Sequence, residues 1–408
     1  MEFTEITRKE YEKFWKESDQ KNFLSSPKIE DLRKESGWDT YYVGVKEGKD
    51  LVAAALLSAH KRHFNKYIFY SPRGPLLDYH DKDLVNFYFN NVKKFIKDHK
   101  GYSYRIDPYI YYKERDIDGN IVEGGFDNTD VTDNLKSLGF KKVPIKDTEQ
   151  VIWMFSLPLE GNSEEDIQKE MKPNTRNTIR KASKLGIEMK ELEYSDLDEF
   201  MNIMKETGER KGFDVRDIAY YQNMYNLFVK DGEAKFFITK LNLKNYINNL
   251  KEEIKDKETK RDELGPQSYN DGKRKTFNQD IENLTKRVKD AEDIIKEKNT
   301  DIINLSGSMF MLIEPEIIYL SSGNYEEFMR FNSQYLIQWE LIKYGIEHGF
   351  KKHNFYGIPA NINEHPKDYG IYEFKRGFNG VVEELIGEYE LPITFHYYLI
   401  KFIRKIKK

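Results

Sequence analysis

The 408-residue chain contains no cysteine. This absence excludes disulfide bonds, thiolate zinc sites, thioester intermediates and a cysteine nucleophile. Histidine is also scarce, with eight residues, and none of them has the spacing of a His-Glu-x-x-His metal motif. Any chemistry must therefore use carboxylates, lysines, arginines, tyrosines and backbone amides.

The sequence also lacks long apolar runs and a strong net charge. No run approaches the roughly 18 residues needed to span a bilayer, and the charged first residues lack the apolar core of a signal peptide, so we expect a cytoplasmic protein. The 66 Lys plus Arg nearly cancel the 70 Asp plus Glu, which leaves a formal charge of -4. Because 38% of the residues are hydrophobic and 14% aromatic, sizeable cores can form, and the length favours two or three domains.

Two series of short strands and a long helix follow the same order along the chain. The first series comprises strands at 41–46, 51–58 and 67–71, a helix at 83–99 and a strand at 102–106. The second comprises strands at 234–240, 305–313 and 317–321, a helix at 328–348 and a strand at 353–356. This repetition predicts an internal duplication and a mixed α/β fold with two sheet-based domains.

Residues 241–300 differ from everything around them, with 14 Lys plus Arg and 13 Asp plus Glu. Apolar residues recur three and four positions apart in two stretches, which flank a helix-breaking segment from Gly265 to Gly272. This pattern predicts an antiparallel coiled-coil hairpin inserted in the second domain. A solvated spacer and a docking arm for a large partner are both compatible with it.

The predicted domains follow from these segments. They are 1–158 for the first, 159–241 with 304–390 for the second, 242–303 for the arm and 391–408 for a basic amphipathic C-terminal helix. In the link, a capping box of Ser163 and Asp166 predicts a helix to about Leu185. A second box, of Ser195 and Asp198, predicts a helix ending at Lys211.

Basic residues gather in two places. The linking helix carries Lys169, Lys172, Arg176, Arg180, Lys181 and Lys184, a stripe that could contact phosphate of tRNA or of lipid headgroups, or could be only a solvated face. The last twelve residues contain five basic and no acidic side chains, with Ile400, Ile403 and Ile406 three apart. Such a helix is typical of contact with an anionic membrane surface, although a terminal tail can also be frayed.

Several short motifs occur in a fixed order. They are Tyr70-Ser71-Pro72-Arg73-Gly74-Pro75 with Asp78-Tyr79, Arg105-Ile106-Asp107-Pro108, Thr207-Gly208-Glu209-Arg210 with Arg216-Asp217-Ile218-Ala219-Tyr220, Gln338-Trp339-Glu340 with Asn354-Phe355-Tyr356-Gly357, and Phe374-Lys375-Arg376-Gly377-Phe378. In this order, and with the predicted arm, they resemble the FemABX family of peptidoglycan peptidyltransferases nearly end to end. The segment from Asp107 to Val122 is most similar to the FemA, FemB and MurN branch.

The resemblance implies two acetyltransferase-like (GNAT) domains, with the helical arm inserted in the second. It implies transfer of an amino acid from aminoacyl-tRNA to an amine of the lipid-linked peptidoglycan precursor, on its stem peptide or growing branch, without a metal or redox cofactor. Because this precursor is lipid-linked, the resemblance also implies an enzyme that acts at the inner face of the cell membrane. Glycine, alanine and serine remain open as the transferred residue, and so do the acceptor position and the oligomeric state.

The resemblance also implies roles for individual residues. Lys375 matches the lysine that stabilises the developing oxyanion, although a surface lysine is the ordinary alternative. Asp107 is the candidate proton acceptor, although Asp before Pro is also a common turn former. Arg216 and Tyr220 match residues that hold the phosphate-bearing precursor. The remaining candidates are substrate contacts at Arg73, Tyr319 and Arg376, and tRNA or phosphate contacts at Arg176, Arg180 and Lys181.

Two other functions compete with this one. An acetyl-CoA-dependent N-acetyltransferase would need an Arg/Gln-x-x-Gly-x-Gly/Ala loop at a helix start to cradle the pyrophosphate, and no such loop stands at the corresponding places. A non-catalytic coiled-coil adaptor at the membrane would bind through the arm and would not need Asp107 or Lys375.

Overall fold

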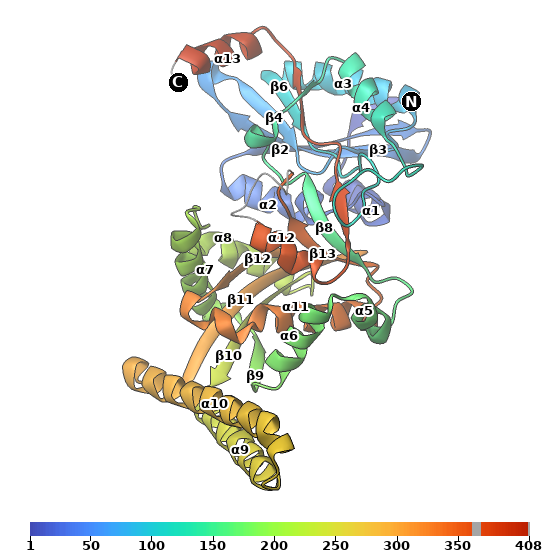
Figure 1. Cartoon of the computed structure of the whole chain (residues 1–408). Coiled ribbons are helices and arrows are strands. Elements are labelled where there is room, and N and C mark those ends of the chain that lie inside the picture. The colour runs from blue at the N-terminus through green and yellow to red at the C-terminus, as the bar shows by residue number, and fades with distance from the viewer. Residues whose placement is uncertain (361–368, 407–408) are drawn as a thin grey trace. The chain divides into compact units, whose positions relative to one another are not determined.

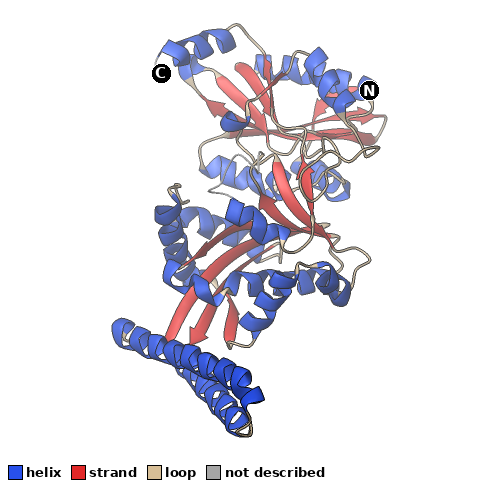
Figure 2. Cartoon of the chain, viewed as in Figure 1, coloured by secondary structure: helices blue, strands red, loops and turns tan. Residues whose placement is uncertain are grey.

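The computed structural model describes residues 1–360 and 369–406, except for the side chains of His63 and of residues 404–406. Its helices and strands alternate along the chain, which confirms the predicted mixed α/β class (Figures 1 and 2). Contacts divide the chain into two compact units. The first contains Met1–Pro158, Ile313–Ile318 and Lys352–Lys408, and the second contains Leu159–Leu312 and Tyr319–Lys351.

The first unit is built around an eight-stranded sheet. The strands follow the order β1 (Glu2–Glu5), β2 (Asp39–Glu47), β3 (Asp50–Lys61), β4 (Tyr67–Ser71), β6 (Gly101–Ile106), β15 (Tyr389–Pro392) and β7 (Lys141–Lys142), with β5 (Leu76–Leu77) paired to β3. The neighbouring strands β4 and β6 are parallel. A parallel pair needs a crossover connection, and α3 (Lys82–Asp98) supplies it.

Helix α3 buries one apolar face on this sheet. Val85, Phe89, Val92 and Ile96 repeat at helical spacing and join a core with Val43, Leu57 and Tyr104. The other helices of the unit are α1 (Arg8–Glu17), α2 (Lys28–Glu35), α4 (Thr129–Ser137), α12 (Tyr369–Arg376) and α13 (His396–Ile406). This core fixes the carboxyl end of β6, where Asp107 follows the strand.

A second group of strands completes the first unit. Strand β8 (Trp153–Pro158) lies between β14 (Val381–Glu384) and β13 (Lys352–Gly357), antiparallel to both. Strand β13 pairs in parallel with the beginning of β12 (Glu316–Asn324), from Glu316 opposite Lys352 to Ile318 opposite Asn354. Polar side chains at these positions therefore lie side by side.

The second unit contains the antiparallel strands β9 (Ile187–Glu191), β10 (Ala234–Asn242) and β11 (Ile302–Ile313), followed by the remainder of β12. Its helices are α5 (Glu164–Glu170), α6 (Pro173–Ser183), α7 (Leu197–Lys211), α8 (Ile218–Met224), α9 (Leu243–Asp262), α10 (Asp271–Lys298) and α11 (Ser333–Glu347), with a π-helical turn at Tyr225–Val229. The predicted repeat is present in the fold. Both β2–β3–β4–α3–β6 and β10–β11–β12–α11–β13 end in a strand parallel to the one before the helix.

Helices α9 and α10 form a two-helix arm inserted at a hairpin, because Asn242 and Ile302 on either side of it pair directly. Ion pairs join Lys251 to Glu292 and Lys257 to Asp280, so the helices run antiparallel (Figure 1). The buried seam consists of Leu243, Tyr246, Ile247, Leu250, Leu284, Val288, Ala291 and Ile294. Coiled-coil supercoiling of this pair stays a prediction.

Two predictions for the link were wrong. The helix expected from Ser163 to Leu185 is interrupted, because Pro173 has no N–H and holds the preceding Lys172 in an extended conformation. The Ser163–Asp166 capping box itself is present. Helix α7 begins at Leu197 without a side-chain cap, and the capping box, formed by Glu193 and Asp196 instead of Ser195 and Asp198, belongs to the preceding 3-10 turn at Tyr194–Asp196.

The predicted domain boundaries differ from the two units. Residues 352–390 were expected in the second domain, whereas their contacts place them in the first unit. The reason is strand pairing, because β15 lies beside β6 and β14 lies beside β8. Periodicity in a sequence does not show which sheet a strand joins.

The C-terminal helix turns a different face to solvent than the spacing of isoleucines predicted. Ile400 is 2% exposed and packs with Tyr397 against Tyr102. Ile406 lies outside the residues whose side chains are described. The exposed apolar side chains are instead Phe395, Tyr398, Leu399 and Phe402. Among residues 1–360 and 369–406, no helix is both long and apolar enough to cross a membrane.

Candidate functional site

Asp107 and Arg73 form a buried pair in the first unit. Asp107 follows β6, and Arg73 lies in the turn between β4 and β5, in a left-handed conformation with φ of 51°. The backbone N–H of Arg73 donates to Oδ1 of Asp107 at 2.9 Å, and its guanidinium Nη1 lies 3.4 Å from Oδ2. Both side chains are at most 3% exposed. Oδ2 is buried beside the Arg73 guanidinium and accepts no other hydrogen bond from the described residues.

The surroundings of Asp107 suit proton transfer near neutral pH. Burial raises the pKa of Asp107 to about 6, and the adjacent Arg73 limits the rise. The carboxyl is therefore mostly ionised at pH 7, yet basic enough to accept a proton.

Glu388 is a second buried carboxylate that the sequence did not reveal. It is 1% exposed, lies 2.9 Å from Arg105 and accepts a hydrogen bond from the backbone N–H of Glu149 at 2.7 Å. Burial raises its pKa to about 7, and the charge of Asp107 adds to the shift. No motif surrounds Glu388 in the sequence, so only the pairing of β15 with β6 could have identified it.

Lys375 lies on α12, near the end of the helix, and is 5% exposed. Its Nζ donates to the carbonyl of Gly357 at 2.6 Å and to that of Tyr356 at 3.3 Å. Burial lowers its pKa to about 7. An ammonium has three N–H bonds, so these two contacts leave one for a substrate oxygen.

Tyr356 connects the surroundings of Lys375 with those of Asp107. Its carbonyl accepts from Lys375, and its backbone has the left-handed φ of 63° that a bulky residue rarely adopts. Burial raises the pKa of its hydroxyl, while the neighbouring Arg73 opposes that shift. Tyr356 thus contacts Lys375 through its carbonyl, and its side chain lies near the Asp107–Arg73 pair.

Arg376 is engaged within the protein. Its guanidinium pairs with Asp118 and, at 3.3 Å, with Glu373. One turn earlier on α12, the hydroxyl of Tyr372 donates to the carbonyl of Ile117 at 2.6 Å. These contacts tie α12 to the turn at Ile117–Asp118 and so fix the helix that carries Lys375.

A buried ion network lies on strands β12, β13 and β14 of the first unit. Lys352 on β13 is 3.2 Å from Glu316 on β12 and 3.2 Å from Glu383 on β14. The hydroxyl of Tyr109 donates to Glu316 at 2.8 Å, and the Arg73 guanidinium lies 5.5 Å from the centre of the Tyr109 ring. Although burial lowers the pKa of Lys352, the two carboxylates raise it well above its usual value.

Replacing Lys352 with methionine should destabilise the first unit, because it leaves two carboxylates buried without a cation. We expect a loss of about 3–5 kcal/mol, which corresponds to a melting temperature lower by roughly 10 °C. Calorimetry measures this shift. Adding Glu316→Gln and Glu383→Gln should recover much of the loss. If Lys352→Met alone has the melting temperature of the wild type, the network contributes little to stability.

In the second unit, Arg216 and Tyr220 lie together but not on one helix. Helix α8 begins at Ile218, so Arg216 precedes it, and its guanidinium lies 5.5 Å from the centre of the Tyr220 ring. Arg216 is exposed. A Cβ on Gly208 would come within 2.2 Å of the Val215 side chain. This close packing fixes the loop that carries Arg216.

The other predicted contacts of the second unit differ in exposure. Tyr319 is 8% exposed, donates to Gln334 Oε1 at 3.0 Å and stacks on Phe310. Burial raises its pKa to about 12. On α6, Arg176 and Arg180 line a cavity, whereas the exposed Lys181 does not.

Comparison with known proteins places the chain in a family. The model of the FemAB family matches residues 6–405. The chain is 30% identical to a protein of Staphylococcus epidermidis named aminoacyltransferase FemB, over 100% of this chain and 99% of the relative. It is 28% identical to aminoacyltransferase FemA of the same species, over the full length of both.

Solved structures agree with this result. The crystal structure of FemX matches with a TM-score of 0.75 and 26% identity, over 98% of this chain and 99% of that one. A tandem GNAT protein from the clavulanic acid biosynthesis pathway matches with a TM-score of 0.51 and 8% identity, over 96% and 98% of the two chains, which shows a shared fold alone. The two units thus have the tandem GNAT-like fold, and the chain belongs to the FemAB family.

Proposed function

We propose that this protein is an aminoacyltransferase that moves glycine, alanine or serine from aminoacyl-tRNA to an amine of the lipid-linked peptidoglycan precursor and so builds the interpeptide bridge. The names of the FemA and FemB relatives support aminoacyl transfer. The observation that carries the proposal is the burial of a lysine and an aspartate on the two sides of Tyr356, with Lys375 held by two backbone carbonyls and Asp107 held by Arg73.

The proposed reaction needs no covalent enzyme intermediate. The acceptor nitrogen attacks the ester carbonyl, a C–N bond forms, and the ester C–O bond breaks to release the ribose hydroxyl of the tRNA. Asp107 accepts the proton that the attacking amine loses, and this proton passes on to the departing ribose oxygen. Lys375 donates a hydrogen bond to the carbonyl oxygen as it gains negative charge, which is the role of an oxyanion hole. Arg73 holds the Asp107 carboxylate in place.

The precursor also carries phosphate, which we propose contacts the second unit through Arg216 and Tyr220. Arg216 is exposed and has no ion pair among the described residues, and a guanidinium suits phosphate because of its fixed fork of donors. Tyr319 and Arg376 are further proposed contacts, although their side chains already have partners within the chain. The basic face of α6 is proposed to contact phosphate.

Replacing Arg216 with alanine should raise the Michaelis constant for the lipid precursor about tenfold, because a charge-assisted hydrogen bond is worth about 1.5–3 kcal/mol. Steady-state transfer assays with varied precursor measure this. The turnover number should change little. Lys211→Ala, another exposed basic residue of this segment, is the matched control. An unchanged constant for Arg216→Ala would refute phosphate binding at this position.

The lipid-linked substrate requires work at a membrane surface, and we propose that α13 contributes the contact. Phe402 on α13 and Phe395 just before it are 63% and 69% exposed. Changing both phenylalanines to serine should weaken binding to phosphatidylglycerol vesicles at least roughly tenfold, since burying one aromatic side chain is worth about 1.5–3 kcal/mol. Vesicle sedimentation measures this, with Ile121→Ser and Ile145→Ser together as control. Equal binding of both double variants would contradict the assignment.

The experiment that tests the proposed function is transfer of labelled glycine, alanine or serine from charged tRNA to lipid precursors of defined branch length. Formation of a labelled precursor identifies both the donor and the acceptor. An acetyl-CoA-dependent enzyme would leave the labelled amino acid on the tRNA and would acetylate an amine only when acetyl-CoA is supplied.

A further inference from the structure

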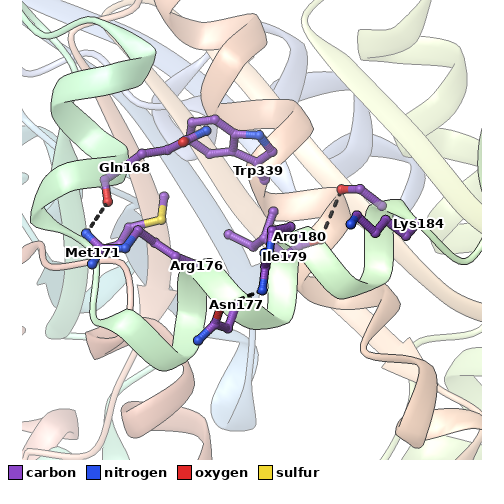
Figure 3. A pocket seen from close by; sticks show the side chains of 9 residues that line it. Gln168, Met171, Arg176, Asn177, Ile179, Arg180, Lys184 and Trp339 are labelled. Atoms are coloured by element: carbon purple, nitrogen blue, oxygen red, sulfur yellow. Dashed lines mark hydrogen bonds between the residues drawn. The ribbon is translucent and has the colours of Figure 1, made fainter. Parts of the chain in front are cut away.

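The second unit contains a cavity of about 550 Å³ between α5, α6 and α11. Figure 3 shows that Arg176, Arg180 and Lys184 enter it from α6, whereas Trp339 enters from α11. Cavities that bind small ligands in proteins have volumes of roughly 300–1,000 Å³. The volume is therefore sufficient for one nucleotide.

The break before Pro173 creates this cavity. Helices α5 and α6 meet at a corner, and Arg176 holds the corner by donating to the carbonyls of Gln168 at 2.9 Å and Lys169 at 2.6 Å. These carbonyls belong to the end of α5, which would otherwise lack partners. Arg176 therefore has a structural role in shaping the cavity, and its positive charge lies on the cavity wall.

The polar part of the cavity is cationic. Arg176, Arg180 and Lys184 are four residues apart and follow one face of α6. None of the nine lining residues is a carboxylate. Within the described part of the chain, no acidic side chain forms an ion pair with Arg180 or Lys184. An uncompensated group of this kind favours an anion.

The rest of the lining suits a planar, hydrogen-bonding ring. Trp339, Met171 and Ile179 are buried and form an apolar floor. Two amide side chains, Gln168 and Asn177, stand beside it, and Asn177 accepts a hydrogen bond from Arg180 at 3.2 Å. A lipid headgroup phosphate would use the cations alone. A nucleotide would use the cations, the apolar floor and the two amide side chains, since proteins hold bases by apolar contact and by hydrogen bonds to their edges.

We propose that this cavity binds one nucleotide of the tRNA, with Arg180 and Lys184 on the phosphate and the Trp339 floor under the base. The inference rests on the proposed function in that tRNA is the amino-acid donor. It goes further by assigning a separate nucleotide site to α6 and α11.

Binding of deacylated tRNA by the full-length protein tests this inference. Arg180→Glu with Lys184→Glu should weaken binding at least tenfold. The slope of log Kd against log salt concentration should become shallower by roughly 0.7–0.9, because one phosphate loses its cationic partners. The control is Lys93→Glu with Lys94→Glu, two exposed lysines of α3 without ion pairs to the described residues, which changes the net charge equally. Tryptophan fluorescence locates the ligand, since tRNA should quench the wild type more strongly than Trp339→Phe.

The possible results separate this inference from the proposed function. Wild-type affinity and salt slope in the α6 variant, with transfer activity intact, would overturn the nucleotide site and leave the proposed function in place. Equal quenching in Trp339→Phe would overturn the position of the base. Loss of binding to phosphatidylglycerol vesicles with unchanged tRNA binding would show a lipid site instead. Wild-type protein that neither binds tRNA nor transfers from it would overturn the proposed function itself.

Discussion

Replacing Lys375 with methionine should lower the turnover number of amino-acid transfer about 10²–10³-fold, because removing one oxyanion donor typically costs this much. Methionine keeps most of the length and apolar bulk of the lysine stem, so the buried position should remain packed. The affinity for both substrates should change much less than the rate. Single-turnover transfer from charged tRNA measures the effect. A rate within a few-fold of wild type would rule out the oxyanion role.

Lys375→Arg separates charge from position. Burial lowers the pKa of Lys375 to about 7, so the fraction of protonated lysine falls tenfold for each pH unit above that value. An arginine stays protonated throughout. The ratio of the wild-type rate to the Lys375→Arg rate should therefore fall as pH rises above about 7, independently of the acceptor amine, which titrates equally in both. A constant ratio would show that the protonation of Lys375 does not control the rate.

Replacing Asp107 with asparagine should lower the rate about 10²–10⁴-fold, the usual contribution of a general base. Asparagine retains an oxygen that can accept from the Arg73 backbone N–H, whereas it cannot take the proton of the amine. Because the pKa of Asp107 is raised to about 6, its carboxylate is lost as pH falls through 6. The acceptor amine also becomes protonated at low pH. The logarithm of the wild-type rate should therefore fall with a slope of about two below pH 6, and that of the variant with a slope of about one.

Asp98→Asn is the control for the loss of one negative charge, since Asp98 is exposed at the end of α3. It should leave the rate and its pH dependence unchanged. If Asp107→Asn also retained the wild-type profile, the base would have to be supplied by another group. Glu388, with a pKa of about 7, would then be the first residue to test.

Local patterns in the sequence predicted much of the fold. The strands at β2, β3 and β10 and the seam from Leu243 to Leu250 are visible because their apolar residues repeat at the period of the element that buries them. The repeat of five elements was visible for the same reason. Lys375 and Asp107 were proposed from their motifs, since composition alone would not have distinguished Lys375 from the many other lysines.

Features that depend on long-range packing were not predictable from these patterns. The three-residue spacing of Ile400, Ile403 and Ile406 gave no sign that Ile400 packs against Tyr102. Lys352, Glu316 and Glu383 are separated in sequence. They become neighbours only because β12 pairs with β13, β13 with β8 and β8 with β14. Pro173 was visible in the sequence, but the strength of the capping signal at Ser163 favoured one continuous helix. The consequence was a missed cavity between α5, α6 and α11.

The most direct test of the proposed function is single-turnover transfer of a labelled amino acid from charged tRNA to the lipid-linked precursor, comparing wild type with Lys375→Met. The wild type should attach glycine, alanine or serine to a precursor amine and release deacylated tRNA in equal amount, and the variant should do so at least about 100-fold more slowly. Absence of transfer by the wild type with all three amino acids and every branch length would contradict the account. Equal rates for the two proteins would contradict the role of Lys375.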